Sequence, residues 1–305
     1  MSRSIPQSES RNYVPLYLIL FPTFLLLAIF CLIPFIWAFV TSFYEYEVGA
    51  PAHFVGLSNY STYLFHDHTL GESLGNMAFL TLFAVVVTVI VPLTIAKLIF
   101  SLSSPRASYV YRILFLIPIL VPSVAVQLIW KDFIYSGTGL LNQFLNILHL
   151  SNLTRGWLSS PHTVLTSIAF IGFPFANGIQ ILIYYAGLTS ISDSVHEAAF
   201  LDGATGVRKF LTIDVPLVLS QIKLLVILTL IGGIQSFESL FILTRGGPGF
   251  KSTVPGLWMY FNAFSFQKMG YACSIGVLLF LLILVLTVIN LKFFRSSEDV
   301  TAASI

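Results

Sequence analysis

Long apolar runs constrain this chain more than any other feature of its sequence. A bilayer core requires about 20 apolar residues in each spanning helix, and five runs meet or nearly meet that length. A sixth run, 219–243, is weaker because Lys223 and Glu238 interrupt it, although Lys223 is close enough to its end to reach the interface. The five stronger runs cover residues 17–43, 76–97, 112–130, 164–188 and 269–291.

The composition also indicates a membrane protein. Hydrophobic residues make up 56% of the 305 residues and charged residues 9%, whereas a soluble domain carries about 25% charged residues. Because so few charges cannot cover a water-exposed surface, the apolar excess must face lipid. We therefore predict an all-α polytopic membrane protein with six transmembrane helices, or five if the weak run does not span. The predicted divisions are a tail at 1–12, a transmembrane domain at 13–295 and a second tail at 296–305.

The placement of Lys and Arg predicts the orientation, because cytoplasmic loops carry an excess of both residues. With the N-terminus inside, ten of the 15 fall in inside segments and five in outside segments. Both tails are therefore predicted to be cytoplasmic, in a multi-pass protein of the cell (inner) membrane. The inside set is Arg3, Arg11, Lys97, Arg106, Arg112, Arg208, Lys209, Lys223, Lys292 and Arg295, and the outside set is Lys131, Arg155, Arg245, Lys251 and Lys268.

The net charge, the cysteines and the prolines indicate which ligands are excluded and where helices bend. The net charge of +2 is too small to indicate a nucleic-acid partner. Cys31 and Cys273 lie inside apolar runs and are predicted to pack there as small hydrophobic residues, and no metal site is expected. Prolines inside the runs predict kinked helices, which neighbouring helices can stabilise by satisfying the freed carbonyl groups. These prolines are Pro22, Pro34, Pro92, Pro118, Pro122 and Pro174.

The inside loop at 190–217 is the most informative segment. Ser194 and Glu197 have the spacing of a capping box, with Ser192 as an alternative cap, so a short helix is predicted here. Gly203 is predicted to end that helix, because glycine enters the left-handed backbone conformation freely. A second short helix is predicted at about 207–213, ending before Pro216. Such a helix–turn–helix is suited to docking on another protein.

The loop carries Glu-Ala-Ala at 197–199 and Asp-Gly-Ala at 202–204, followed by a phenylalanine, an isoleucine and a proline. This pattern resembles the coupling motif of permease subunits in binding-protein-dependent ABC importers. Two positions depart from the usual pattern, since Val215 stands where leucine is usual and Ser220 where a second proline is common. Outside the loop, 54–60 resembles the first outside loop of the family, and 243–253 and 270–272 resemble its carbohydrate branch. The residues that match the coupling motif are Glu197, Ala198, Ala199, Asp202, Gly203, Ala204, Phe210, Ile213 and Pro216.

The resemblance implies a type I ABC importer permease fold and half of a translocation path for a sugar or related solute. It implies four partner chains besides lipid, namely a second permease, two ATP-binding subunits and an extracytoplasmic solute-binding protein. The segment 246–252 fails the phosphate-loop pattern, because Phe250 replaces the glycine expected before Lys251. ATP is therefore expected to be bound and hydrolysed by partner subunits, with no cofactor in this chain. The implied ATPase-coupling residues are Glu197, Ala198, Ala199, Asp202 and Gly203.

Two other classes of function are weighed against this one. An ion-coupled secondary carrier usually buries ionisable residues near the bilayer midplane, and this chain offers at most Glu238, near the outer end of a run. An intramembrane enzyme would need a nucleophile with a membrane-embedded histidine, whereas all six histidines fall in predicted loops. No catalytic residue is predicted.

Polar side chains inside the apolar runs are the candidates for a substrate path. Asn177, Gln180 and Tyr184 recur at three- and four-residue steps, which places them on one face of a helix. Interhelical hydrogen bonding is the competing explanation for each of them. A carboxylate facing lipid is costly, so Glu238 is expected to face a cavity or a partner. The full set of candidates is Gln127, Asn177, Gln180, Tyr184, Gln235 and Glu238.

Overall fold

The computed structural model describes residues 14–173 and 177–293. Within these ranges the chain is helical apart from its loops and one antiparallel hairpin, formed by β1 (Tyr44–Glu45) and β2 (His53–Phe54). Pro174 and the predicted tails at 1–12 and 296–305 lie outside the described residues. Three helices are long and apolar enough to cross a membrane, or up to five segments if each of two bent helix pairs counts as one span.

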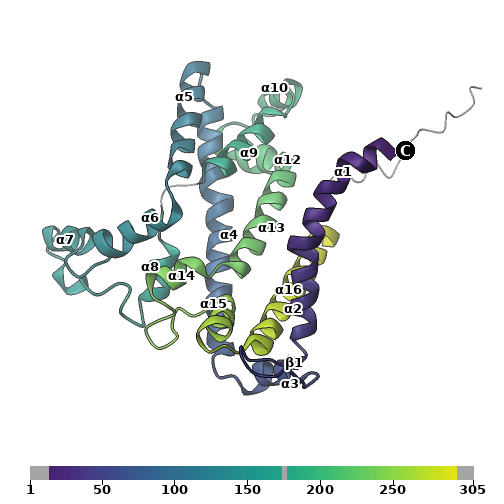
Figure 1. The fold of residues 1–305 in the computed structure, drawn as a ribbon. Helices are drawn as coiled ribbons and strands as arrows, with labels where there is room; N and C mark the ends of the chain where they lie inside the picture. Colours follow the sequence, from purple (N-terminus) through teal and green to yellow (C-terminus); the bar gives the residue numbers. More distant parts are fainter. Residues whose placement is uncertain (1–13, 174–176, 294–305) are drawn as a thin grey trace, which may run out of the picture.

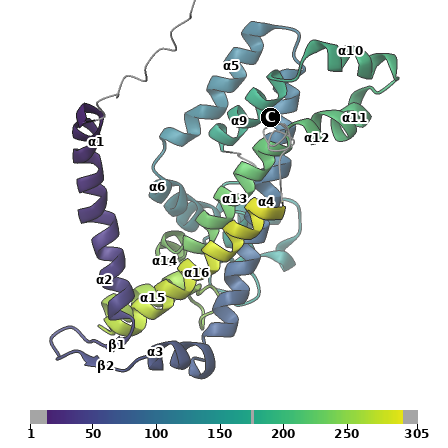
Figure 2. The same ribbon diagram turned by 90° about the vertical axis from the view of Figure 1, so that its right-hand side faces the viewer.

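The first span is a continuous helical rod made of α1 (Val14–Leu27), the π-helical turn η1 (Ala28–Leu32) and α2 (Ile33–Thr41). The π turn precedes Pro34, whose ring would clash with the carbonyl of residue 30 in a regular α-helix. In Figures 1 and 2, α1 stands apart from the other helices, and α2 meets α16 (Met269–Phe293). Phe35 and Phe280 join the two helices with ring centroids 5.0 Å apart.

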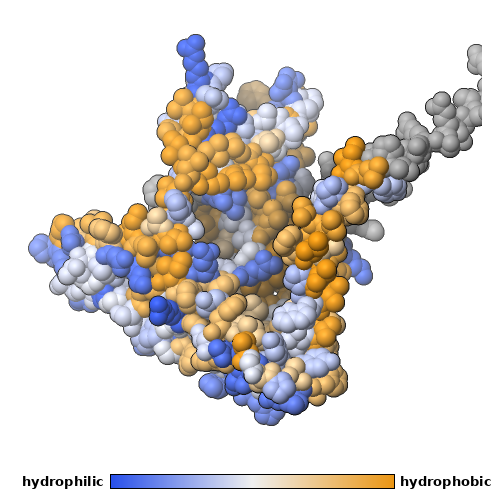
Figure 3. Space-filling model, viewed as in Figure 1, coloured by the Kyte–Doolittle hydropathy of each residue, from blue (hydrophilic) through white to orange (hydrophobic). Residues whose placement is uncertain are grey.

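Exposed apolar side chains cover most of this rod, and Figure 3 shows hydrophobic residues over its surface. None of its most apolar stretch is buried against the rest of the chain. A long apolar helix with so little protein contact has the surface expected of a membrane-spanning helix.

Three helices form the centre of the fold, namely α4 (Leu70–Phe100), α9 (Gly178–Thr189) and α13 (Leu219–Gln235). Both α9 and α13 pack on α4, as Figure 1 shows. Pro92 lies inside α4 without interrupting the helix. A hydrophobic cluster joins the three elements near one end, and its buried residues are Leu93, Ala96, Ile99, Ile181, Tyr184, Leu188, Val218 and Leu225.

The run at 112–130 is sharply bent, as its prolines predict. The helices α5 (Pro105–Leu116) and η3 (Ile117–Leu120) form the first arm, and α6 (Ser123–Leu128) and η4 (Ile129–Ile134) form the second, at 83° to the first. Val121 is extended, with φ −81° and ψ 125°. The ring of Pro122 disfavours the helical conformation for the residue before it, which accounts for the bend at this point.

The run at 164–188 is not one continuous helix, which corrects the prediction for the fourth span. It contains α8 (Val164–Ala169) and the 12-residue helix α9. The backbone is extended at Asn177, whose side chain accepts a hydrogen bond from the Ile179 amide and so starts α9. Gly178 then allows close packing, because a Cβ there would lie 2.3 Å from the Phe115 carbonyl oxygen of α5.

The run at 219–243 is also interrupted. Helix α13 ends at Gln235, the backbone of Ser236 is extended, and the separate helix α14 (Glu238–Leu243) follows. The structure therefore differs from six unbroken helices at the positions where polar residues and prolines enter the apolar runs.

The two ends of the bundle carry different elements. The loop end carries α10 (Asp193–Leu201), α11 (Gly206–Lys209), η6 (Phe210–Asp214) and α12 (Val215–Leu217), which project beyond the end of α4 in Figure 2. The hairpin end carries the β hairpin with α3 (Ser58–Ser61), η2 (Thr62–His66), α15 (Pro255–Tyr260) and η7 (Phe261–Ser265). The helices α7 (Leu140–Ile147) and η5 (Ser151–Leu153) extend to the side.

Candidate functional site

A hollow of about 390 Å³ lies among α4, α8, α9 and α14, and we call it the first hollow. Its polar lining comes from Thr88, Asn177, Gln180, Ser236 and Ser239, and its remaining lining is mostly apolar. The interruption after Gln235 brings Ser236 and Ser239 into this lining. The break in that run therefore opens polar backbone and hydroxyl groups toward the interior of the bundle.

Gln180 points across the helix interface toward α4. Its Nε2 donates to Thr88 Oγ1 at 3.4 Å, and Thr229 Oγ1 of α13 donates to the same oxygen at 3.3 Å. Asn177 is exposed and already uses its side-chain oxygen to cap α9. The first hollow therefore presents amide and hydroxyl groups that carry no charge.

A second hollow of about 320 Å³ adjoins the first, since Ser236 and Ser239 line both. Gln127, Gln235 and Glu238 also line it. Gln127 is 7% exposed and its Nε2 donates to Ser239 Oγ at 2.9 Å, while its Oε1 has no hydrogen-bond partner among the described residues. Gln235 and Glu238 are exposed and flank the break at Ser236. Glu238 thus faces a hollow, as its charge predicts.

Tyr184 lies outside both hollows, in contrast to the face predicted for Asn177 and Gln180. It is fully buried in the hydrophobic cluster between α4, α9 and α13. The periodicity was correct for a helix, but only the start of that helix borders the hollow, and the next turn packs on α4. Conversely, Thr88, Ser236 and Ser239 were missed, because single hydroxyl groups in apolar runs carry little sequence signal.

The loop helix α10 ends at Leu201, and Gly203 follows its cap with φ +70°, as predicted. The Gly203 amide donates to the Phe200 carbonyl at 3.1 Å, and the Ala204 amide donates to the Ala199 carbonyl at 2.9 Å. These two bonds form a Schellman motif, which requires a left-handed residue at the glycine position. The turn between the two loop helices is therefore defined by one glycine.

The predicted capping box does not form at the start of α10. The Ser192 side chain occupies the cap position without accepting a bond from a backbone amide of the helix, and its hydroxyl lies 3.0 Å from that of Ser194 instead. Within the described part of the chain, no hydrogen bond or ion pair holds the exposed side chain of Glu197. The second loop helix also differs from its prediction, since helical backbone continues through Pro216 after the π turn η6.

The loop presents apolar side chains to the outside. Phe200, Leu201 and Val207 are 73%, 84% and 74% exposed. Of the residues that match the coupling motif, Glu197, Ala198, Asp202 and Gly203 are exposed and Ala199 is buried. Three large exposed apolar side chains around one turn are typical of an interaction surface.

A third hollow, which we call the end hollow, lies at the hairpin end and has a volume of about 410 Å³. Its lining includes Asp67, which accepts hydrogen bonds from the Thr69 amide and hydroxyl, Trp258 and Tyr271. Partial burial raises the pKa of Asp67, but the hydrogen bonds outweigh burial and hold its pKa below the ordinary value. This carboxylate therefore joins the first hairpin-end loop to α15 and α16 while remaining ionised at neutral pH. No group of three or more potential metal ligands occurs among the described residues.

Comparison with known proteins decides the family. The family described as "Binding-protein-dependent transport system inner membrane component" matches residues 98–296. The chain belongs to this family. It is thus the inner-membrane component of a binding-protein-dependent transport system and a multi-pass membrane protein, which confirms the resemblance found in its sequence. Membership removes the ion-coupled carrier and the intramembrane enzyme as alternatives.

Relatives along the whole chain are named as permeases rather than enzymes. The "Probable ABC transporter permease protein YurN" of Bacillus subtilis (strain 168) is 32% identical, over 95% of this chain and 99% of the relative. The "Sulfoquinovosyl glycerol transport system permease protein SmoG" of Agrobacterium fabrum is 30% identical, over 92% of this chain and 90% of the relative. The "Arabinooligosaccharides transport system permease protein AraP" of Bacillus subtilis (strain 168) is 30% identical, over 90% of this chain and 87% of the relative.

A solved structure confirms the fold of this inner-membrane component. One chain in the crystal structure of a bacterial alginate ABC transporter, in complex with an alginate pentasaccharide-bound periplasmic protein, superposes with a TM-score of 0.81 at 20% identity. The match covers 93% of this chain and 95% of that chain. The fold is therefore that of a type I ABC importer permease.

Proposed function

We propose that this inner-membrane component forms half of the translocation path for a sugar or a related polyhydroxylated solute. The observation that carries the proposal is the pair of adjoining hollows, lined by amide and hydroxyl groups within an apolar bundle. Amides and hydroxyls both donate and accept hydrogen bonds, which matches the hydroxyl groups of a sugar. The names of two relatives, for arabinooligosaccharides and sulfoquinovosyl glycerol, support the same class of solute.

Within this proposal, five of the six candidate side chains have distinct positions. Gln180 and Asn177 border the first hollow, and Gln127, Gln235 and Glu238 border the second. The Oε1 of Gln127, which has no hydrogen-bond partner in the described part of the chain, is a buried acceptor that a solute hydroxyl can satisfy. Glu238 supplies the carboxylate of the second hollow, where it can accept two hydroxyl donors at once.

The energy is proposed to enter through the loop at 190–217. Its exposed apolar tip, formed by Phe200, Leu201 and Val207, supports docking on an ATP-binding subunit. Glu197 and Asp202 are exposed beside this tip and are free to contact the same partner. ATP would be bound and hydrolysed in two such subunits, and the loop end would face the cytoplasm together with both termini. The hairpin end would then face the solute-binding protein, and a second permease would complete the path.

A reconstituted complex tests this function. The chain, its partner permease and ATPase subunits, and the solute-binding protein are placed in proteoliposomes, and a panel of saccharides is screened for stimulation of ATP hydrolysis and for uptake. We expect one saccharide class to stimulate both activities, and Gln180→Ala to reduce uptake of it. Uptake that proceeds without ATP hydrolysis, or stimulation only by solutes that lack hydroxyl groups, would contradict the proposal.

A further inference from the structure

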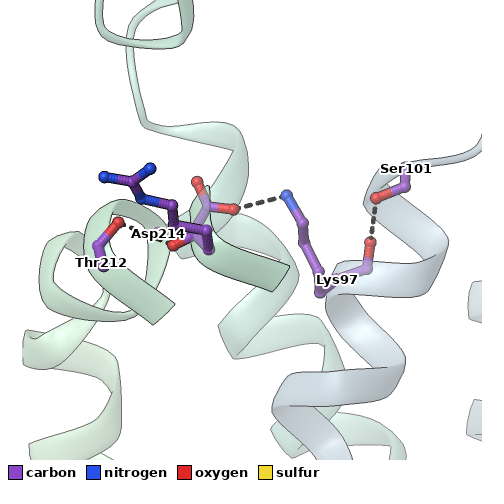
Figure 4. A network of polar contacts seen from close by, with 5 residues as sticks. Lys97, Ser101, Thr212 and Asp214 are labelled. Carbon is purple, nitrogen blue, oxygen red and sulfur yellow. Dashed lines mark hydrogen bonds and ion pairs between the residues drawn. The ribbon is translucent and has the colours of Figure 1, made fainter. Parts of the chain in front are cut away.

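A buried ion pair joins the loop at 190–217 to the longest helix of the bundle. Lys97, in the last turn of α4, places its Nζ 2.6 Å from Asp214 Oδ2 at the end of η6. Figure 4 shows the two side chains reaching toward each other across the gap between these elements. The two residues are 117 positions apart in the sequence.

The Lys97–Asp214 ion pair is buried, which distinguishes it from a solvent-exposed surface ion pair. Asp214 is fully buried and Lys97 is 19% exposed on its side chain. Asp214 Oδ1 accepts no hydrogen bond from the described residues, so the carboxylate depends on Lys97 for its stabilisation there. A buried carboxylate that loses its cation is left uncompensated in a medium of low dielectric, and this strongly opposes separation of the two groups.

The same turn of α4 also holds the first helix of the loop. The Phe100 ring lies 5.9 Å from the His196 ring of α10, measured between centroids, and Lys97 Nζ lies 5.3 Å from the centre of the Phe100 ring. The first loop helix, α10, therefore contacts Phe100, and the later loop segment, η6, contacts Lys97, which lies three residues earlier in α4. A displacement of the loop cannot leave this turn unchanged.

From that turn, α4 continues without a break past the hollows to the hairpin end. Thr88 of α4 contacts Gln180 at the first hollow, and Asn76 donates to the Thr253 carbonyl at 2.9 Å. The helix has 31 residues, a length of about 46 Å at 1.5 Å per residue. A rigid helix of this length carries a shift at one end to the other.

We infer that the Lys97–Asp214 ion pair, which we call the strut, transmits movement of the docked loop to α4 and so to the hollows. Lys97 and Asp214 act here as positioning residues that contact neither solute nor nucleotide. The inference rests on the proposed docking of the loop on an ATPase subunit.

The deciding variant replaces both charges, as Lys97→Met with Asp214→Leu. Apolar residues of similar volume commonly replace a buried ion pair without loss of folding, so the complex is expected to assemble. In proteoliposomes containing the full transporter, we expect the ATP hydrolysed per solute imported to rise by at least about fivefold, the lower end of typical coupling between sites. Lys97→Arg retains the charge and should keep the wild-type ratio.

The chain offers a matched control at the other end of the same helix. Lys251 and Glu72 form a partly exposed ion pair of 2.6 Å, with side chains 51% and 32% exposed. The double variant Glu72→Leu with Lys251→Met removes an ion pair from α4 without touching the loop. Its ratio of ATP to solute should equal that of the wild type.

A wild-type ratio in the Lys97→Met/Asp214→Leu variant would overturn the inference. If that variant does not assemble, Asp214→Asn decides in its place, because asparagine keeps the volume and an acceptor for Lys97 while removing the charge. A raised ratio then supports the strut, and an unchanged one refutes it. Failure of the docking proposal is recognised separately, since Gly203→Pro would then also leave the ratio unchanged.

Discussion

Replacing Gly203 with proline changes the turn that joins the two loop helices. The native residue has φ +70° and donates its amide hydrogen to the Phe200 carbonyl. Proline holds φ near −65° and has no amide hydrogen, so the backbone must rotate by roughly 135° and the bond is lost. The neighbouring bond from the Ala204 amide to the Ala199 carbonyl belongs to the same motif and is lost with it.

The energetic cost is expected to stay local. Two backbone hydrogen bonds contribute about 1 kcal/mol each to stability, so the change costs roughly 2 kcal/mol within an exposed loop. Space is not limiting, because a Cβ at this position meets nothing within 4 Å. The spans should therefore insert normally, while Glu197 and Ala198 are displaced relative to α11. Gly203→Ala retains the amide hydrogen and costs about 1–2 kcal/mol for its left-handed backbone, so it should largely keep the turn.

The assay measures ATP hydrolysis and solute uptake by the whole transporter in proteoliposomes, together with the amount of ATPase subunit bound to the membrane. For Gly203→Pro we expect either release of the ATPase subunit or hydrolysis without uptake. Gly49→Pro is the matched control, since Gly49 also has a positive φ (+91°) and open space around it, but lies in the turn between the strands at the hairpin end. The control should retain coupled uptake. Normal uptake by Gly203→Pro with the ATPase still bound would refute the proposed role of the loop.

Three further predictions concern orientation, the path and pH. Reporter domains fused after Arg106 and after Gly203 should be cytoplasmic and one fused after Asn59 external, and an external signal at Gly203 would contradict the assignment of the loop. Gln180→Ala and Glu238→Ala should each lower uptake while the complex still assembles by gel filtration, and normal uptake by both would show them to be packing residues. Asp67→Asn should lower the Tm by the equivalent of roughly 1–3 kcal/mol, because the Trp258 and Tyr271 donors lose a charged acceptor. The pKa of Asp67 is lowered in the folded state. The difference in Tm between Asp67→Asn and the wild type should therefore stay constant above about pH 5 and shrink below about pH 4, as the carboxylate protonates. A difference in Tm that grew on acidification would refute this prediction.

Structural features that depend only on residues close together in the chain could be predicted from the sequence. A continuous apolar run specifies a spanning helix because its own backbone hydrogen bonds are internal, and this was sufficient for the first run and for α4 and α16. The turn at Gly203 and the bend before Pro122 were equally accessible, since each follows from the backbone freedom of one residue. The coupling pattern was recognisable for the same reason, because its residues lie within one short loop.

The helix interruptions could not be predicted from hydropathy. The runs at 164–188 and 219–243 have the composition of single spans, yet each is divided where a cap or an extended residue meets neighbouring helices. Close packing of Gly178 on α5 accompanies the first break, and an extended Ser236 marks the second. Hydropathy averaged along a run detects neither feature.

The polar groups that meet in the structure come from distant parts of the chain. Gln127 bonds to Ser239, 112 residues away, and Lys97 pairs with Asp214, 117 residues away. Nothing local distinguishes Gln180, which borders a hollow, from Tyr184 one turn later, which is buried against α4. The sequence alone determined that the chain is a helical membrane protein whose loop at 190–217 resembles the coupling motif of this family. Only the tertiary structure decided which polar residues share a hollow and which are joined by charge, because these contacts depend on how separate helices pack against one another.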